Sequence, residues 1–378
     1  MPENLLPVLA SIATGMFLGL MPNLLSRLRR PLAQRLGMEE SAVGNLDPWF
    51  LIAFAPALAL GGNAVDNWGG REVLFAGALL ACVGLASLGV KLSLSSLIPV
   101  IMLLGAAWGI LVAGGLALMA GEFWGANSPA GALNLGFFGV GLGVVLCPIF
   151  ARLLGTRFTF RTGMLLVGLA GLIPAILVMF TLKSSYHEPM PAEELGPLLS
   201  QPYFWFALLV GFIALPLENG LAIWPNQFLA SLGYGERATH GWLIGFWLAF
   251  LAARLGTGLI LLEGWEGGWI LILILLIAIT MGNMAGAYGH ASGWGLLLVG
   301  ACQGPIWPCI LGLVLALFPG APFTATCLVY AAGAIGSLLA IPFLNWLRRG
   351  VSLRHSLLAW LGLNLLMAAP ILVLALAN

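Results

Sequence analysis

Two ionisable side chains lie inside long apolar stretches, where they could bind a ligand or carry a proton. Glu218 falls in an apolar stretch over 202–230, roughly 24 Å from its start at 1.5 Å per residue and near the middle of a long predicted helix. Arg254 falls in the stretch 241–262. Charged groups are costly in a bilayer and usually face a cavity or a partner. We therefore expect Glu218 to exchange a coupling proton or to bind substrate hydroxyl groups; a purely structural pair with Arg254 is the alternative.

Amide and indole side chains accompany these charges at helical spacing. Asn219 and Asn226 lie seven residues apart, and Gln303 and Trp307 lie four apart. Amides hydrogen-bond hydroxyl groups while indole rings cover apolar sugar faces, so the set suits a neutral polyhydroxylated ligand, although the tryptophans could equally serve packing. The candidate ligand-binding residues are Glu218, Asn219, Trp224, Asn226, Gln303, Trp307, Trp108, Asn134 and Asn283, the last two being second-rank candidates.

The composition requires membrane-spanning helices to position these residues. Apolar residues make up 61% of the 378 positions and charged residues only 8%, whereas about a quarter of an ordinary soluble domain is charged. A span needs about 20 apolar residues. Such segments fall at 5–25, 45–61, 72–91, 96–121, 130–152, 162–182, 202–230, 241–262, 268–288, 294–318, 324–347 and 355–377. The sequence predicts a six-helix bundle over 1–183, a cytoplasmic linker over 184–200, and a second bundle over 201–378.

The two halves share a pattern of glycine and proline in the fifth and eleventh segments. In the fifth, Gly139, Gly141 and Gly143 precede Pro148, and in the eleventh Gly333 precedes Pro342 at the same spacing of nine residues. Small residues at such positions let helices approach closely in lipid. An internal repeat of this kind is typical of transporters, although glycine-rich spans occur in many membrane proteins.

The sequence lacks the residues that several kinds of chemistry require. The two lysines follow no Gly-x-x-x-x-Gly loop, so no ATP-binding P-loop is predicted. The five cysteines show no Cys-x-x-Cys spacing and the four histidines form no His-x-x-x-His pair, so we expect no metal, cofactor or disulfide. The net charge of +1 gives no reason to expect nucleic acid. No positive region precedes the first apolar segment, which is therefore expected to be retained rather than cleaved as a signal peptide.

One motif could indicate an enzyme. His290-Ala-Ser292-Gly293 resembles part of the serine motif of intramembrane hydrolases. It falls in a predicted loop, lacks the leading glycine and has no second embedded histidine. We expect no enzyme activity.

A motif lies between the second and third apolar segments. Gly62-Asn-Ala-Val-Asp66-Asn-Trp-Gly69-Gly70-Arg71 resembles the signature loop of the major facilitator superfamily, with Asn67 and Gly70 at two usually basic positions. The resemblance implies an all-α membrane protein with twelve transmembrane helices in two pseudo-symmetric six-helix bundles. A solvated turn is the alternative interpretation.

The same resemblance implies a gate. Asp66 would face the start of the eleventh span near Thr324, and Arg71 would pair with Glu122 at the end of the fourth. A carboxylate can cap a helix N-terminus in this way. The implied gate residues are Gly62, Asp66, Gly69, Arg71 and Glu122.

Further segments are similar to the fucose:proton symporter branch of that family. They are Leu133-Asn134-Leu-Gly136-Phe-Phe-Gly139, Glu218-Asn219-Gly220, Phe246-Trp247 and Gly304-Pro305-Ile306-Trp307-Pro308. The resemblance implies a secondary transporter that works by alternating access and takes up a sugar or similar solute with a proton. Its partners would be a small molecule, a proton through Glu218 and Arg254, and the lipid bilayer of a bacterial inner membrane, with the protein acting as a monomer. The first and fourth spans lack the acid and the embedded arginine that many relatives use for coupling.

The distribution of basic residues conflicts with the family orientation, in which both termini are cytoplasmic. The residues that would then lie outside are Arg27, Arg29, Arg30, Arg35, Lys91, Arg152, Arg157, Arg161, Arg237, Arg348, Arg349 and Arg354, twelve of the fifteen Lys and Arg. This inverts the positive-inside rule. Either the orientation differs from that of the family, or the arginines attract an anionic ligand. The alternative function is therefore a carrier or exporter of an organic anion or lysolipid.

Overall fold

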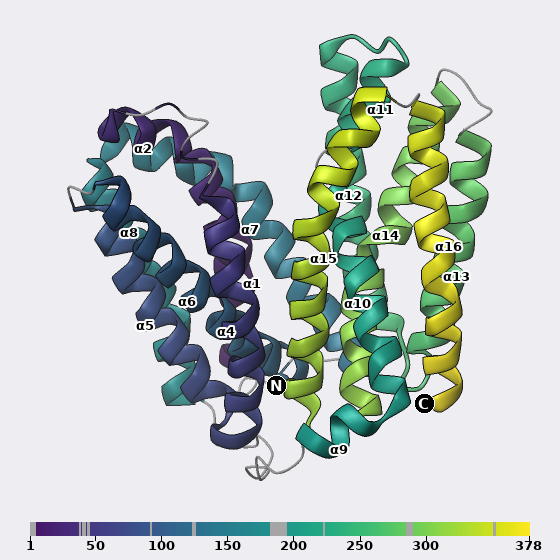
Figure 1. The fold of residues 1–378 in the computed structure, drawn as a ribbon, viewed down its shortest axis with the longest axis horizontal. Helices are drawn as coiled ribbons and strands as arrows, with labels where there is room; N and C mark the ends of the chain where they lie inside the picture. The colour runs from purple at the N-terminus through teal and green to yellow at the C-terminus, as the bar shows by residue number, and fades with distance from the viewer. Residues whose placement is uncertain are drawn as a thin grey trace. The chain divides into compact units, whose positions relative to one another are not determined.

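The computed structural model describes residues 5–37, 39, 43, 46–90, 93–122, 126–181, 195–221, 224–284, 290–350 and 353–378. Its elements are all helices (Figure 1), with no strand among the described residues. Twelve helices are long and apolar enough to cross a membrane, as the sequence predicts. The fold is therefore that of an all-α membrane protein.

The helices group into two compact units, each described by itself. Unit 1 comprises Met1–Trp124, Leu135–Leu195 and Gly320–Ala331, and unit 2 comprises Gly125–Asn134, Gly196–Pro319 and Ala332–Asn378. Two long helices contribute to both, since α7 (Pro129–Arg157) begins in unit 2 and α15 (Pro322–Gly350) begins in unit 1. These are the two segments with the shared glycine-to-proline spacing.

Unit 1 is built around α6, which packs along α4 and α5, while α5 also packs on α8 (Figure 1). Besides its part of α7, unit 1 holds α1 (Leu5–Arg27), α2 (Arg29–Leu36), α4 (Asp47–Trp68), α5 (Gly70–Leu88), α6 (Leu94–Glu122) and α8 (Phe160–Thr181). The short helix α2 was not predicted; it buries Leu32 and Ala33 and ends at Gly37, whose φ of 67° suits glycine.

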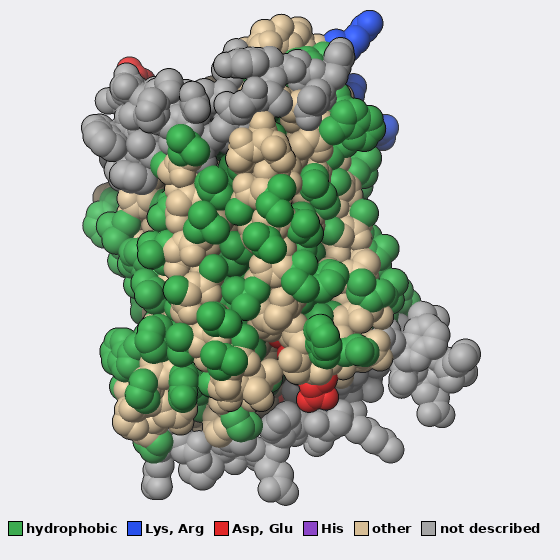
Figure 2. All heavy atoms as spheres, turned by 90° about the vertical axis from the view of Figure 1, so that its right-hand side faces the viewer, with side chains coloured by type: hydrophobic (Ala, Val, Ile, Leu, Met, Phe, Trp, Pro, Cys, Tyr) green, Lys and Arg blue, Asp and Glu red, His purple; other side chains and the backbone are tan. Residues whose placement is uncertain are grey.

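Unit 2 is built around α14, which packs along α12 and α13, while α16 packs on α10 and α13. Besides its part of α15, its helices are α9 (Leu195–Ser200), α10 (Pro202–Gly220), α11 (Trp224–Ser231), α12 (Glu236–Ile260), α13 (Glu266–Met284), α14 (His290–Leu317) and α16 (Leu353–Ala377). Hydrophobic side chains cover most of the face shown in Figure 2. Leu275, Ile279 and Leu366 are among the exposed apolar residues of α13 and α16, as expected of surfaces that meet lipid tails.

Glycines set the closest helix contacts in both units. A Cβ on Gly15 would lie 2.8 Å from the carbonyl oxygen of Gly136, so α1 and α7 touch backbone to backbone. A Cβ on Gly333 would lie 2.8 Å from the carbonyl oxygen of Gly211, so α10 and α15 do the same. The small residues of the fifth and eleventh spans therefore serve close packing, as predicted.

Three boundary predictions were wrong. The predicted seventh span ends as a helix at Gly220, and a second helix begins at Trp224. Gly220 and Pro225 disfavour one continuous helix here. The predicted loop from Gly62 to Arg71 is helical except for Gly69, which has a φ of 101°. His290 lies not in a loop but at the start of α14.

Candidate functional site

An ion pair lies inside unit 2. The guanidinium of Arg254 on α12 donates to Glu218 Oε1 on α10 at 2.6 Å, and its Nε donates to the carbonyl oxygen of Gly304 on α14 at 2.8 Å. The guanidinium carbon also lies 4.3 Å from the centroid of the Phe250 ring. Arg254 is 2% exposed, and these contacts hold it at the junction of three helices. Its charge is thus balanced by one carboxylate, one carbonyl dipole and one aromatic face.

Glu218 lies near the end of α10, not near the middle of a long helix as predicted. Its backbone carbonyl accepts the N–H of Leu221 at 3.1 Å, and the helix ends at Gly220. Its side chain is 18% exposed, and no described residue donates to Oε2. Glu218 thus keeps one carboxylate oxygen for another donor.

Asn219 and two stacked indoles lie next to the ion pair along the chain. Asn219 Nδ2 donates to Ser337 Oγ on α15 at 2.9 Å. The ring of Trp224 on α11 stacks on that of Trp360 on α16, with centroids 6.4 Å apart and ring planes at 13°. Gly220 directly faces the Trp360 ring, so glycine at this position leaves room for the indole. With the ion pair, six helices of the chain therefore contribute polar and aromatic groups to unit 2: α10, α11, α12, α14, α15 and α16.

Helix α14 adds an amide to this region of unit 2. Gln303 and Trp307 lie one turn apart on α14, and each is 1% exposed. Gln303 directly precedes Gly304, the acceptor of Arg254. Among the described residues no donor reaches Gln303 Oε1. This buried amide oxygen is a candidate acceptor for a ligand hydroxyl group.

The other predicted ligand-binding residues differ in burial and in partners. Asn226 on α11 and Asn283 on α13 are exposed, and Asn226 does not share a helix with Asn219. Asn134 is fully buried in unit 2, where its Nδ2 donates to the Ala130 carbonyl at 2.9 Å and to Cys309 Sγ at 3.3 Å. Trp108 is buried on α6 of unit 1.

The sequence interpretation missed two residues of the site. Ser337 binds Asn219, and Trp360 stacks on Trp224. Ser337 is one turn beyond Gly333 on the eleventh segment, and Trp360 is one turn before the buried Asn364. A search for polar residues at helical spacing in these two segments could have found both.

Buried polar atoms without a protein partner are concentrated in unit 2. In the part of unit 1 that the structure describes, they are the hydroxyl groups of Ser11 and Thr14. In unit 2 they include Asn134 Oδ1, Glu218 Oε2, Gln303 Oε1, both carboxylate oxygens of Glu266, Asn364 Oδ1 and the indole N–H groups of Trp224, Trp269 and Trp360. Buried polar atoms normally have partners, and such exceptions often mark a ligand site.

Asp66 at the end of α4 caps the start of α15 within unit 1. Its carboxylate accepts the backbone N–H of Phe323 at 3.1 Å, the N–H of Thr324 at 2.7 Å and the Thr324 hydroxyl at 2.6 Å. Asp66 is 9% exposed. The contact with Thr324 expected from the sequence is present, and it places a negative charge at a helix N-terminus.

The other predicted gate residues surround this cap. A Cβ on Gly62 would lie 2.5 Å from the Phe323 carbonyl oxygen, so only glycine lets α4 approach α15 this closely. Arg71 donates to Glu72 Oε1 at 2.8 Å. The predicted pair of Arg71 with Glu122 lies outside the described side chains. Gly69 forms the sharp turn between α4 and α5.

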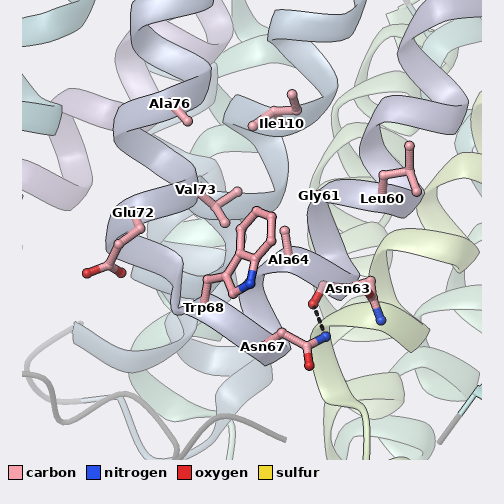
Figure 3. A pocket seen from close by; sticks show the side chains of 10 residues that line it. All are labelled: Leu60, Gly61, Asn63, Ala64, Asn67, Trp68, Glu72, Val73, Ala76 and Ile110. Carbon is pink, nitrogen blue, oxygen red and sulfur yellow. Dashed lines mark hydrogen bonds between the residues drawn. The ribbon is translucent and has the colours of Figure 1, made fainter. Parts of the chain in front are cut away.

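A cavity of about 530 Å³ lies in unit 1 (Figure 3). Its walls come from α4, α5 and α6 and include Leu60, Val73 and Ile110. Asn67 Nδ2 donates to the Asn63 carbonyl oxygen at 2.8 Å at one end of the cavity. The cavity is mainly apolar, and the sequence interpretation proposed no site there.

Residues 5–341 of the chain match the sequence model of the Major Facilitator Superfamily. A comparison with curated proteins finds no match.

Solved structures of transporters share the fold. A Major Facilitator Superfamily transporter, FucP, in the outward conformation has a TM-score of 0.78 at 14% identity, over 99% of this chain and 98% of that one. The proton:xylose symporter XylE bound to 6-bromo-6-deoxy-D-glucose has a TM-score of 0.70 at 16% identity, over 97% and 94%. The human organic anion transporter TETRAN has a TM-score of 0.69 at 16% identity, over 98% of both chains.

Proposed function

Because this integral, multi-pass membrane protein belongs to the major facilitator superfamily, whose members are transporters, we propose that it is a secondary active carrier. It takes up a sugar or a similar small neutral solute together with a proton, as a monomer in a bacterial inner membrane. It works by alternating access, in which a central site opens to one side of the bilayer at a time.

The observation that carries this proposal is that unit 2 holds the Glu218–Arg254 pair together with buried amide, carboxylate and indole atoms to which the described residues supply no partner. The pair has no net charge, so the site does not select an ion by its overall charge. No described residue donates to Glu218 Oε2 or Gln303 Oε1, so both can accept hydroxyl groups. The Trp224 side chain offers an apolar ring face and its own indole N–H donor. A neutral polyhydroxylated solute satisfies all of these groups.

Glu218 is the proposed carrier of the coupling proton. When Oε1 binds a proton the carboxyl becomes neutral, and its attraction to Arg254 weakens. Arg254 then keeps the Gly304 carbonyl and the Phe250 ring as partners. Substrate binding next to the pair is thereby linked to protonation.

The gate of the proposed carrier is the cap on α15. Asp66 holds the first turn of α15 against α4, and Gly62 permits the close approach. Gly69 and Arg71 shape the adjoining turn. Breaking and remaking this cap would accompany the change of access.

The first test is thermal stabilisation of the purified protein by fucose, xylose and a panel of organic anions and lysolipids. A ligand that binds the native state raises its apparent stability, by about 2.7 kcal/mol at a concentration 100 times Kd. We expect a neutral sugar to stabilise the wild type and not Gln303→Ala. Stabilisation by anions alone would refute the neutral-solute proposal.

Counterflow in proteoliposomes tests coupling. We expect saturable exchange of the stabilising sugar in the wild type, with a rate that depends on pH. Glu218→Gln keeps the shape of a protonated glutamate and should exchange sugar without pH dependence. Unchanged pH dependence in this variant would remove Glu218 from the coupling.

An organic-anion or lysolipid carrier is the second candidate. The observation that favours it is the group of twelve basic residues that lie on one side of the membrane by the order of the spans. Such a group raises the local concentration of anions at one opening of a carrier. The same ligand panel decides between the two functions.

A further inference from the structure

Glu266, the first residue of α13, carries a buried carboxylate that has no hydrogen-bond partner among the described residues. Its side chain lies in unit 2 and its exposure is 0%. No described residue donates a hydrogen bond to either carboxylate oxygen. Glu72, in the first turn of α5 in unit 1, is the comparable acid; its side chain is 44% exposed and it pairs with Arg71. Two acids at similar positions thus have opposite environments.

Among the described residues, no cationic side chain compensates a negative charge on Glu266. The α16 face that meets it through Ala375 and Gly267 carries no titratable side chain between Leu358 and Ala377. The turn before it contributes Glu263, a like charge. On α14 the Cys309 thiol interacts electrostatically with both Glu266 and Arg254. The backbone N–H groups of Glu266 itself and of Gly264 lie beside the carboxylate but make no hydrogen bond of acceptable geometry.

Two backbone N–H groups at a helix N-terminus offset only part of a buried negative charge, so a carboxylate in this environment favours binding a proton or a cation. An isolated charge in an apolar medium is so unfavourable that such groups become neutral instead. Metal cations require several oxygen ligands. Among the residues that the structure describes, no group of three or more His, Cys, Asp or Glu could hold a metal. The bound species that fits the site is therefore a proton.

The turn directly before Glu266 is exposed. Glu263, Gly264 and Trp265 are exposed, and Trp265 directly precedes the buried Glu266. Gly264 has a φ of 81° and makes the turn sharp. The Leu261 carbonyl of the same linker accepts the Ser128 hydroxyl at 3.2 Å, and Ser128 caps the first turn of α7. The exposed turn therefore directly adjoins the buried carboxylate along the chain.

We propose that Glu266 is a second proton-binding carboxylate of unit 2, which exchanges its proton with the solution at the α12–α13 turn. A carboxylate oxygen accepts a proton from a hydronium ion to give a neutral carboxyl and water, and the reverse step releases it. This assignment rests on the proton coupling proposed above. In that scheme Glu266 binds the proton nearer to solution, and Glu218 binds it beside the substrate. The Cys309 thiol interacts electrostatically with Glu266 and with Arg254, the partner of Glu218.

The test is infrared difference spectroscopy of the purified full-length protein between acid and alkaline pH, without added substrate. We expect the carbonyl band of a protonated, buried carboxyl in the wild type and its loss in Glu266→Gln. Glu263→Gln, an exposed neighbour in the same turn, is the matched control and should keep the band. Glu266→Asp should shift the band without removing it, which keeps the test decisive if the Gln variant does not fold.

An unchanged band in folded Glu266→Gln would overturn the assignment. So would a band that disappears in Glu218→Gln and persists in Glu266→Gln, because Glu218 would then be the group observed. The measurement is separate from transport. A Glu266 band in a protein that no sugar stabilises would refute the proposed substrate and leave the proton site in place.

Discussion

Removing the Asp66 carboxylate should loosen the start of α15 from α4. Asp66 accepts three hydrogen bonds from Phe323 and Thr324 and is nearly buried. The change is Asp66→Ala, which leaves two backbone N–H groups and one hydroxyl without their acceptor. Asp66→Asn is the matched variant, since it keeps the size and one acceptor oxygen but not the charge.

The magnitude follows from the contacts that are lost. Replacing a capping residue by Ala costs about 1 kcal/mol and up to about 2. A hydrogen bond to a charged group contributes about 1.5 to 3 kcal/mol. These terms overlap, so we expect Asp66→Ala to lower the free energy of local opening by about 2 to 4 kcal/mol in total. At about 1.4 kcal/mol per factor of ten, this is a roughly 30- to 700-fold change in the local opening equilibrium. Asp66→Asn should give a smaller change.

Cys327 reports this opening directly. It lies one turn beyond Thr324 on α15, is 0% exposed, and would contact a Cβ on Gly62 at 2.6 Å. In a variant that keeps Cys327 as its only cysteine, a membrane-permeant maleimide should react at a rate set by local opening when reclosing is faster than labelling. Asp66→Ala should accelerate that reaction by the factor given above.

A control on a different helix separates local from global opening. The control variant keeps Cys82 as its only cysteine. Cys82 lies on α5 and packs against Gly168 of α8. Its labelling should not change on Asp66→Ala. Labelling of Cys327 within about threefold of the wild-type rate, less than 1 kcal/mol, would refute the capping argument. Equal acceleration at both cysteines would show global destabilisation instead.

Two further substitutions test the site in unit 2 by thermal unfolding. Arg254→Met leaves the Glu218 carboxylate buried without its cation and should destabilise the protein by about 3 to 5 kcal/mol. The double variant with Glu218→Gln should recover much of this loss. A double variant no more stable than Arg254→Met would contradict the argument. Gly220→Ala should cost about 1 to 3 kcal/mol because its methyl group overlaps the Trp360 ring. Gly362→Ala, with open space around it, is the control, and an equal effect there would contradict the packing argument.

Composition and spacing predicted the membrane helices because burial in lipid imposes strong local requirements. Each span needs about 20 apolar residues, so the twelve segments could be read along the chain. The glycines of the fifth and eleventh spans predicted close packing for the same reason. Helix ends were harder, since Gly62–Trp68 is helical and the seventh span is interrupted after Gly220. A helix end depends on local hydrogen bonds and packing that hydropathy does not record.

The sequence also identified the embedded charges Glu218 and Arg254, because ionisable residues are rare in apolar segments. Their pairing, and the hydrogen bond from Arg254 to the Gly304 carbonyl oxygen, require α10, α12 and α14 to pack together. The capping of α15 by Asp66 was expected from a motif, but its three hydrogen bonds depend on the backbone of a helix more than 250 residues away in sequence.

Only the tertiary structure distinguished Glu266 from other acids at helix starts. In the sequence Glu72 and Glu266 both follow a glycine-containing turn and begin an apolar helix. Packing leaves the first near Arg71 and exposed, and buries the second completely. The sequence by itself therefore determined which residues are costly to place in a membrane. The fold decided which of them have partners, because burial and partner distance are properties of packed helices and not of one segment.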